Sequence, residues 1–339
     1  MTYVGPRLDH LPIVGICGES GSGKTALIAR LVERAQRKGW MVLVVDRDRE
    51  VLVAGSGMIE SDPWFSAGAD VLCRDGRQTF VRTHGGDGVG IEVLLRRAAA
   101  RYDLVLVEDH AVASLPTKIW LRRNAQAAPP VLAGPIALDL LPSDDREEMA
   151  FALIERALAA IARDVPLYGV VLLGDRNEII GEDVGKVLSA LSPLVDATLL
   201  AGPGTIPADL LSLPRLTDVP GKPGPLGGMV AALRWQPRAR FVFVACDMPN
   251  ITTEMLSAML AQMHPGVLGI MGQREPHLAI EPFPCVLDGR MGSELEFVND
   301  PSSLVLSAGL GIFQVPTGWH GAFQPPSPMD SPQSVAASG

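Results

Sequence analysis

The residues best suited to do chemistry stand near the start of the chain, in the segment Gly18–Thr25. This segment reads Gly-Glu-Ser-Gly-Ser-Gly-Lys-Thr and matches the phosphate-binding loop pattern of a glycine, four residues of any type, then Gly-Lys-Thr. An apolar run over 11–17 predicts a buried strand before it, and apolar residues at helical spacing over 26–32 predict a helix after it. Such a loop points backbone N–H groups at phosphate oxygens. The sequence therefore predicts a nucleoside triphosphate site.

The residues of this loop have distinct predicted roles. The Lys24 ammonium would reach the terminal phosphates, and the Thr25 hydroxyl would help to hold Mg²⁺. Glycines are needed because side chains would block the approach of phosphate, and because some loop positions require positive φ. We expect the nucleotide to contact Gly18, Gly21, Ser22, Gly23, Lys24 and Thr25, with Lys24 catalytic and Thr25 also a metal ligand.

Two acidic residues at predicted strand ends would complete this site. Asp46 follows the apolar run 41–45, and Glu108 follows the run 104–107. Ligands of an open parallel sheet gather at the carboxyl ends of its strands, where both carboxylates would lie. We interpret Asp46 as a metal ligand and Glu108 as a catalytic residue that orients an attacking water. A solvated turn residue is the alternative for each.

Composition narrows the class of protein. The 339 residues are 47% apolar and 20% charged, with a formal net charge of −9, which argues against a general nucleic-acid or anionic-membrane surface. No apolar run approaches the roughly 20 residues that span a bilayer. The residues 1–6 lack the features of a secretion signal. The four cysteines are scattered without paired spacing, so we expect reduced thiols in the cytoplasm.

Alternating strand and helix patterns predict two α/β domains and a tail. The first domain is expected over 1–163, with helices near 88–101 and from a Ser143 cap to about 161, and a strand at 131–133. The second is expected over 164–321, and its predicted elements are strands at 167–173, 197–200 and 241–245 and helices at 184–191, 228–233 and 253–263. The residues 322–339, rich in Pro, Ser and Ala, are expected to be a disordered tail.

Two features of the second half are suited to bind a ligand. The segment 224–228 reads Gly-Pro-Leu-Gly-Gly and predicts a tight turn into a helix, which allows close approach of a base or a sugar. Asp247 follows the apolar strand 241–245, a position at which a carboxylate can hold a metal ion. A plain loop-to-helix junction and a turn aspartate are the simpler interpretations.

The order of motifs in the first half resembles the small P-loop GTP-binding protein of molybdopterin-guanine dinucleotide biosynthesis. The resemblance covers about residues 12–163 and rests on the phosphate loop followed by Ser61–Ala69, Tyr102–Glu108 and Pro116–Ile119. It implies GTP as the nucleotide, Mg²⁺ as the metal and weak GTP hydrolysis. Asp46-Arg47-Asp48 stands where that family has a histidine-bearing segment.

The second half resembles the molybdenum cofactor guanylyltransferase family. In that family an aspartate precedes Gly-Pro-Leu-x-Gly and a strand ends in Cys-Asp-x-Pro, which matches Asp218 with 224–228 and Cys246–Pro249 here. The resemblance implies that Asp247 holds Mg²⁺. It also implies nucleotide contacts by Asp218, Gly224, Pro225 and Leu226.

The glycine-rich loop that opens this second family is altered. The family has an arginine and a lysine that grip the triphosphate, but the aligned positions here hold Ile179 and Val184, and Asp175 replaces a glycine. The nearby Lys186 stands two residues late. Because these changes remove charge stabilisation of the transition state, we expect the second domain to bind but to transfer guanylyl poorly.

Both resemblances together imply a P-loop NTPase domain followed by a Rossmann-like nucleotidyltransferase-type domain, acting in molybdenum cofactor biosynthesis or delivery. The expected ligands are Mg²⁺, GTP and a molybdopterin-type cofactor. The expected protein partner is a molybdoenzyme or a cofactor-insertion protein, and a homodimer is left open. The alternatives are an active bifunctional guanylyltransferase, a non-enzymatic delivery scaffold for a molybdenum or tungsten enzyme, and a generic P-loop kinase.

Overall fold

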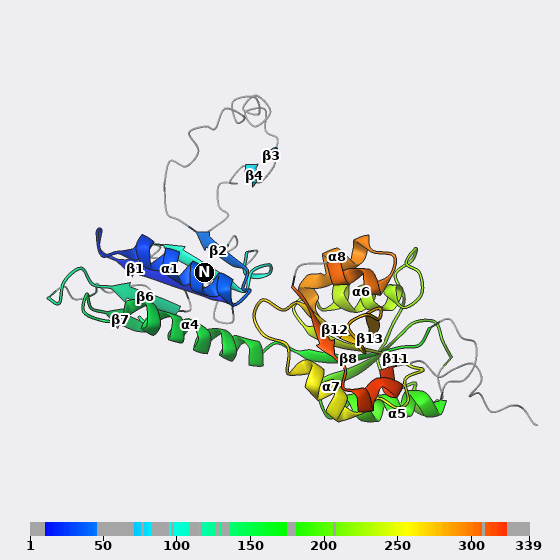
Figure 1. Cartoon of the computed structure of the whole chain (residues 1–339). Coiled ribbons are helices and arrows are strands. Elements are labelled where there is room, and N and C mark those ends of the chain that lie inside the picture. Colours follow the sequence, from blue (N-terminus) through cyan, green and yellow to red (C-terminus); the bar gives the residue numbers. More distant parts are fainter. Residues whose placement is uncertain are drawn as a thin grey trace, which may run out of the picture. The chain divides into compact units, whose positions relative to one another are not determined.

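Two compact units make up the chain: the first comprises Met1–Arg37 and Met41–Ile161, and the second comprises Lys38–Trp40 and Ala162–Gly339. In each unit helices cover the faces of a β-sheet (Figure 1). The computed structural model describes residues 11–45, 71–75, 78–82, 95, 98–108, 115, 117–126, 129, 136–174, 181–205, 208–306 and 309–323.

The first unit is built on a parallel sheet with the strand order β2-β5-β1-β6-β7 in the described residues. The strands of this sheet are β1 (Ile13–Gly18), β2 (Val42–Val45), β5 (Leu104–Glu108), β6 (Thr117–Leu121) and β7 (Leu138–Leu140). A separate antiparallel pair is formed by β3 (Val71–Asp75) and β4 (Gln78–Arg82).

Helices α1 (Lys24–Arg37) and α4 (Arg146–Arg163) pack against each other in the first unit. The Arg34 guanidinium of α1 lies 4.2 Å from the ring centroid of Phe151 on α4. Its Nη1 also donates to Glu148 Oε2 at 2.6 Å. The apolar residues of both helices recur at helical spacing and are buried, which is the pattern of helices that cover a sheet.

The start of α4 differs from the sequence-based expectation. The helix begins at Arg146, and Asp145 Oδ1 accepts a hydrogen bond from the Glu148 backbone N–H at 3.2 Å. Asp145 is therefore the capping residue, and the predicted Ser143 cap is wrong, since Ser143 lies in an exposed turn. The predicted strand 131–133 lies outside the described residues, as does most of the predicted helix 88–101, in which Leu95, Ala98 and Ala99 are described as helical.

The second unit is built on a mixed sheet with the order β10-β9-β8-β11-β13-β12-β14 in the described residues. Its strands are β8 (Leu167–Leu172), β9 (Ala197–Ala201), β10 (Arg215–Leu216), β11 (Arg240–Ala245), β12 (Gly269–Gln273), β13 (Glu281–Asp288) and β14 (Leu310–Gln314). The strands β10, β9, β8 and β11 are parallel, whereas β13 runs antiparallel to both of its neighbours.

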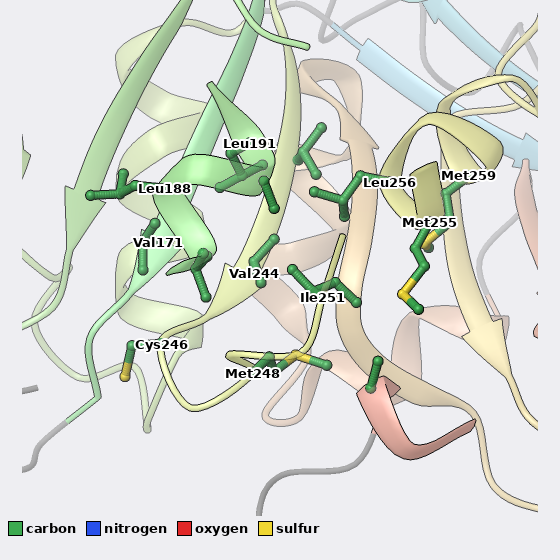
Figure 2. Packing of buried hydrophobic residues seen from close by; sticks show 14 of the residues in the cluster. Val171, Leu188, Leu191, Val244, Cys246, Met248, Ile251, Met255, Leu256 and Met259 are labelled. Atoms are coloured by element: carbon green, nitrogen blue, oxygen red, sulfur yellow. The ribbon is translucent and has the colours of Figure 1, made fainter. Parts of the chain in front are cut away.

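Helices cover both faces of this second sheet, with α6 and α8 on one face and α5 and α7 on the other (Figure 1). The helices are α5 (Gly181–Leu191), α6 (Leu226–Trp235), α7 (Thr253–Leu260) and α8 (Gly292–Phe297), and the 3₁₀ turns are η1 (Ala208–Leu210), η2 (Gly289–Met291), η3 (Pro301–Leu306) and η4 (Thr317–Phe323). Figure 2 shows Leu191 of α5 and Leu256 of α7 in one buried cluster with Val171 and Val244 of the central strands.

The described part of the second unit contains four strands that the sequence did not predict, namely β10, β12, β13 and β14. Glycines open and interrupt β12, and Pro282 and Pro284 interrupt the apolar pattern of β13, so neither segment reads as a central strand. In the described part of the chain, no helix combines the length and the apolar character needed to cross a membrane.

The packed part of the second unit extends past the predicted start of the tail. Ala322 and Phe323 are buried, with Phe323 only 1% exposed. Phe323 lies directly over Gly272 of β12, where an added Cβ would stand 2.8 Å from Phe323 Cε1. The residues 324–339 lie outside the described residues.

The burial of Phe323 predicts a large contribution to stability. Changing Phe323 to Ala removes a fully buried ring and should lower the free energy of unfolding by about 3 kcal/mol, measured by denaturant titration. Phe297→Ala is the matched control, because the Phe297 side chain is 86% exposed. Equal stability of the two variants would contradict this account.

Candidate functional site

The loop between β1 and α1 has the backbone geometry of a phosphate cradle. Gly21 and Gly23 have φ values of 75° and 92°, a left-handed conformation that favours glycine. The loop ends at Lys24, where α1 begins, so the positive end of the helix dipole faces the loop. A cavity of about 510 Å³ opens at this point, and it is lined by Ser20, Gly21, Gly23, Lys24, Thr25, Ala26 and Glu108.

Three of the predicted side chains meet in this cavity. The Lys24 Nζ donates to the carbonyl oxygens of Gly18 at 3.0 Å and Glu19 at 2.9 Å. The Thr25 hydroxyl donates to Glu108 Oε1 at 2.8 Å. The parallel pairing of β1 with β5, in which Ile16 is the partner of Glu108, carries this carboxylate to the loop.

The oxygen atoms of Thr25 and Glu108 suit Mg²⁺, which prefers hard oxygen ligands and keeps several waters. The described residues include no group of three or more His, Cys, Asp or Glu side chains able to hold a metal ion. Phosphate oxygens and water would therefore supply most of the coordination sphere. Asp46, the other predicted ligand, lies outside the described residues.

Arg146 braces the loop from a distant part of the chain and was not identified from the sequence. Its guanidinium donates to three carbonyl oxygens, those of Ser22 at 2.8 Å, Arg122 at 2.5 Å and Leu141 at 2.8 Å. The bond to Ser22 joins residues 124 positions apart, so no local pattern could have revealed it. In the sequence, Arg146 is distinguished only by its position in the first turn of the helix α4.

An ion pair holds the strand ends that Arg146 contacts. Arg122 Nε donates to both carboxylate oxygens of Asp139 at 2.9 Å, which joins the ends of β6 and β7. These hydrogen bonds hold the pKa of Asp139 below its usual value. Because the Arg122 carbonyl also accepts from Arg146, the loop and the sheet edge form one connected unit.

Ser22 and Lys118 lie beneath the surface of the first unit. Ser22 is 5% exposed, and its Oγ lies 2.8 Å from where a Cβ on Gly18 would stand. This hydroxyl makes no hydrogen bond to a described residue, and the Ser22 carbonyl is the group that Arg146 binds. Lys118, part of the Pro-x-Lys-Ile element, is fully buried in β6, and burial lowers the pKa of its ammonium.

The second unit has a pocket of about 390 Å³ at the carboxyl end of β8 and β11. Two predicted site residues, Pro225 and Asp247, belong to its lining. The described residues that line it are Leu172, Leu173, Gly174, Pro225, Ala245, Cys246, Asp247, Met248, Glu281, Pro282, Phe283 and Phe323. Most of these described residues are apolar, and the charged ones among them are acidic.

The other predicted nucleotide contacts lie beside this pocket. Leu226 is fully buried in the first turn of α6, so its side chain packs in the core beneath the loop that precedes this helix. Asp218 packs against the same turn, because an added Cβ on Gly227 would stand 2.8 Å from Asp218 Cβ. The absence of a side chain at Gly227 therefore allows Asp218 to approach the positive end of α6. Gly224 is exposed with φ of 51°.

The altered glycine-rich loop is described in part. Gly174 lines the pocket, whereas 175–180 lie outside the described residues. Val184, which stands where the related family has a lysine, is fully buried in α5. Lys186 lies on the surface of α5 with its Nζ 3.9 Å from Asp183 Oδ1, and it does not belong to the described lining of the pocket.

Glu281 is a pocket residue that the sequence analysis missed. It begins β13, and the antiparallel direction of β13 places this start at the carboxyl end of β11, near Asp247. Arg274 contacts Glu281 Oε1 through Nε at 2.7 Å and through Nη2 at 2.6 Å. A correct prediction of the strand and its direction would have been needed to place Glu281 here.

The brace made by Arg146 predicts a measurable effect on the phosphate loop. Arg146→Gln removes the three-carbonyl contact of the guanidinium and should weaken triphosphate binding about tenfold, measured by calorimetry. Arg156→Gln is the control, because Arg156 is an exposed arginine of the same helix. If both variants bind triphosphate like the unaltered protein, the brace does not organise the loop.

Comparison with known proteins finds a matching family model for a segment of each unit. Residues 13–138 match the family model "Molybdopterin guanine dinucleotide synthesis protein B", and residues 184–298 match the "MobA-like NTP transferase domain". No curated protein matches the chain.

Solved structures with similarity to the chain are of both kinds. A crystal structure of molybdopterin-guanine biosynthesis protein B is 22% identical and covers 45% of this chain and 99% of its own, with a TM-score of 0.31. MobB of Bacillus subtilis is 17% identical, with coverage of 43% and 97% and a TM-score of 0.30. A nucleotidyl transferase from Methanothermobacter thermautotroptrophicus is 11% identical, with coverage of 45% and 88% and a TM-score of 0.33. From the two family matches, the chain joins a domain of the molybdopterin guanine dinucleotide synthesis protein B family to a MobA-like NTP transferase domain, as its sequence motifs predicted.

Proposed function

We propose that this protein acts in molybdopterin guanine dinucleotide biosynthesis, with GTP bound by its first unit and a guanine nucleotide or the cofactor bound by its second. The observation that carries this proposal is the cavity of about 510 Å³ at which Lys24, Thr25 and Glu108 meet. Their ammonium, hydroxyl and carboxylate groups lie beside a helix N-terminus, a combination suited to a triphosphate with Mg²⁺.

The side chains of the first unit have separate tasks in this proposal. Lys24, which now donates to two backbone carbonyls, would exchange these neutral acceptors for charged phosphate oxygens and gain stronger hydrogen bonds. The Thr25 hydroxyl would turn from Glu108 toward the metal ion, and Glu108 would then accept from an attacking water. This assigns the first unit a weak GTPase activity.

The second unit is proposed to bind more readily than it transfers. Asp247 would hold Mg²⁺ at the pocket, and the metal would supply positive charge to a leaving pyrophosphate. Among the described lining residues, however, the charged ones are the carboxylates Asp247 and Glu281. Glu281 is paired with Arg274, and no lysine or arginine belongs to the described lining. The described lining therefore offers carboxylates but no cation to a triphosphate, which supports impaired guanylyl transfer. The active bifunctional enzyme remains the second candidate, because Asp247 does lie in a pocket large enough for a small molecule.

The first test of the proposal concerns Lys24. Lys24→Ala removes the cation of the loop and should weaken Mg²⁺-dependent GTP binding by about 3 kcal/mol, more than a hundredfold in Kd, measured by calorimetry. Arg30→Ala serves as the control, because Arg30 is an exposed cation of the same helix. An unchanged Kd in Lys24→Ala would place the triphosphate elsewhere, and a preference for ATP over GTP would count against the assigned nucleotide.

The second test concerns guanylyl transfer. Purified protein with GTP, Mg²⁺ and molybdenum-loaded pterin should form dinucleotide and pyrophosphate at a rate near background, measured by chromatography. Asp218→Ala should weaken guanine-nucleotide binding to the second unit, because the variant removes a carboxylate packed against the start of α6. Robust dinucleotide synthesis would favour the bifunctional enzyme instead if Asp247→Ala abolishes it and Asp209→Asn does not. Asp209→Asn is the control because Asp209 is exposed.

A further inference from the structure

The pocket of the second unit combines apolar walls with the carboxylates of Asp247 and Glu281, and Arg274 holds that of Glu281 in place. Leu173, Met248, Phe283 and Phe323 provide the apolar part of the lining, and the volume of about 390 Å³ falls in the range of small-molecule sites. Phe323 and Met248 are 1% and 3% exposed, so these walls are firmly packed. Figure 2 shows Met248 beside Ile251 at the edge of the buried cluster of this unit. Such walls suit a flat ring rather than a triphosphate.

Glu281 is the charged residue that β13 contributes to the described lining of this pocket. Its side chain is 19% exposed, and that of its partner Arg274 is 21% exposed. The Nε and Nη2 atoms of Arg274 both contact the same oxygen of Glu281, Oε1. No described residue donates a hydrogen bond to Oε2. Arg274 therefore holds the carboxylate in place beside the apolar walls, and Oε2 is left to accept from a ligand.

A charged carboxylate selects among flat rings by the pattern of donors at their edges. It accepts best from a ring N–H that stands next to an exocyclic amino group, because both groups donate. Adenine and uracil alternate donors with acceptors at the corresponding edge, and an acceptor facing a carboxylate is repelled. The 2-amino-4-oxopyrimidine ring, shared by guanine and pterin, presents the matching pair of donors.

We propose that Glu281 is a specificity-determining residue of the second unit, which accepts hydrogen bonds from the 2-amino edge of a 2-amino-4-oxopyrimidine ring held between the apolar walls of the pocket. The inference rests on the proposed function, since it names the ring class for the ligand of that same unit. It assigns to Glu281 a contact with the ring itself and to Arg274 the positioning of the carboxylate.

The test compares ligands that differ by the amino group. Pterin and lumazine form one pair and guanosine and inosine the other, and none carries a phosphate that the loop at Lys24 could bind. Pterin and lumazine are titrated into the full-length protein by their own fluorescence, and the nucleosides are measured by competition with pterin. We expect pterin and guanosine to bind at least about tenfold more tightly than lumazine and inosine.

Glu281→Gln should reduce this discrimination to less than about threefold, because the neutral amide loses the charge and presents a donor of its own. Glu275→Gln is the matched control, since Glu275 is an exposed glutamate near the same turn that does not belong to the described lining of the pocket. Glu281→Asp keeps the partner charge for Arg274 but withdraws the carboxylate, and it should also lose discrimination. Thermal unfolding of all three variants separates loss of recognition from loss of fold.

The outcomes separate this inference from the proposed function. Discrimination in one pair alone assigns the pocket to the nucleotide or to the pterin. Equal binding of the two ligands within both pairs, or discrimination that survives in Glu281→Gln, overturns the inference. If the same preparation still binds GTP in a Lys24-dependent manner, the proposed function stands. If, in addition, the unaltered protein does not bind GTP, both the inference and the proposed function are overturned.

Discussion

The parallel hydrogen bonding of neighbouring strands is the constraint on which both candidate sites depend. Parallel strands bring their carboxyl ends to one edge of a sheet, so residues far apart in the chain meet there. In the first unit, the pairing of β1 with β5 sets Glu108 within 2.8 Å of the Thr25 hydroxyl across 83 positions of sequence. In the second unit, the pairing of β8 with β11 brings Gly174 and Asp247 to one pocket.

The phosphate loop depends on a further interaction that arises outside the motif. A loop of glycines has little side-chain packing to hold it, and its carbonyl groups need partners. Arg146 supplies a partner to the Ser22 carbonyl and connects it to the ends of β6 and β7, where Arg122 and Asp139 form their ion pair. The loop is thus organised both by its own backbone conformation and by a guanidinium from α4.

The two sites differ in charge, and this difference bears on what each can bind. The cavity of the first unit contains Lys24 beside a helix N-terminus, which favours an anion. The described lining of the second pocket contains carboxylates among apolar side chains, which favours a flat ring with N–H donors over a bare triphosphate. The antiparallel strand β13 contributes to this difference, because its first residues, which include Glu281 and Phe283, lie at the pocket. If all strands were parallel, only the loops that follow the strands would lie at this edge of the sheet.

The sequence by itself determined the contiguous features. The phosphate loop, most of the described helices, the strands β1, β2, β5, β8, β9 and β11 and the two family resemblances follow from neighbouring residues. This is because local φ, ψ and apolar periodicity are set over short stretches. The tertiary structure decided which distant groups meet. Sheet order and strand direction brought Arg146 to Ser22 and Glu281 to the pocket of Asp247, and core packing turned Leu226 inward. These outcomes depend on long-range pairing, which no local pattern encodes.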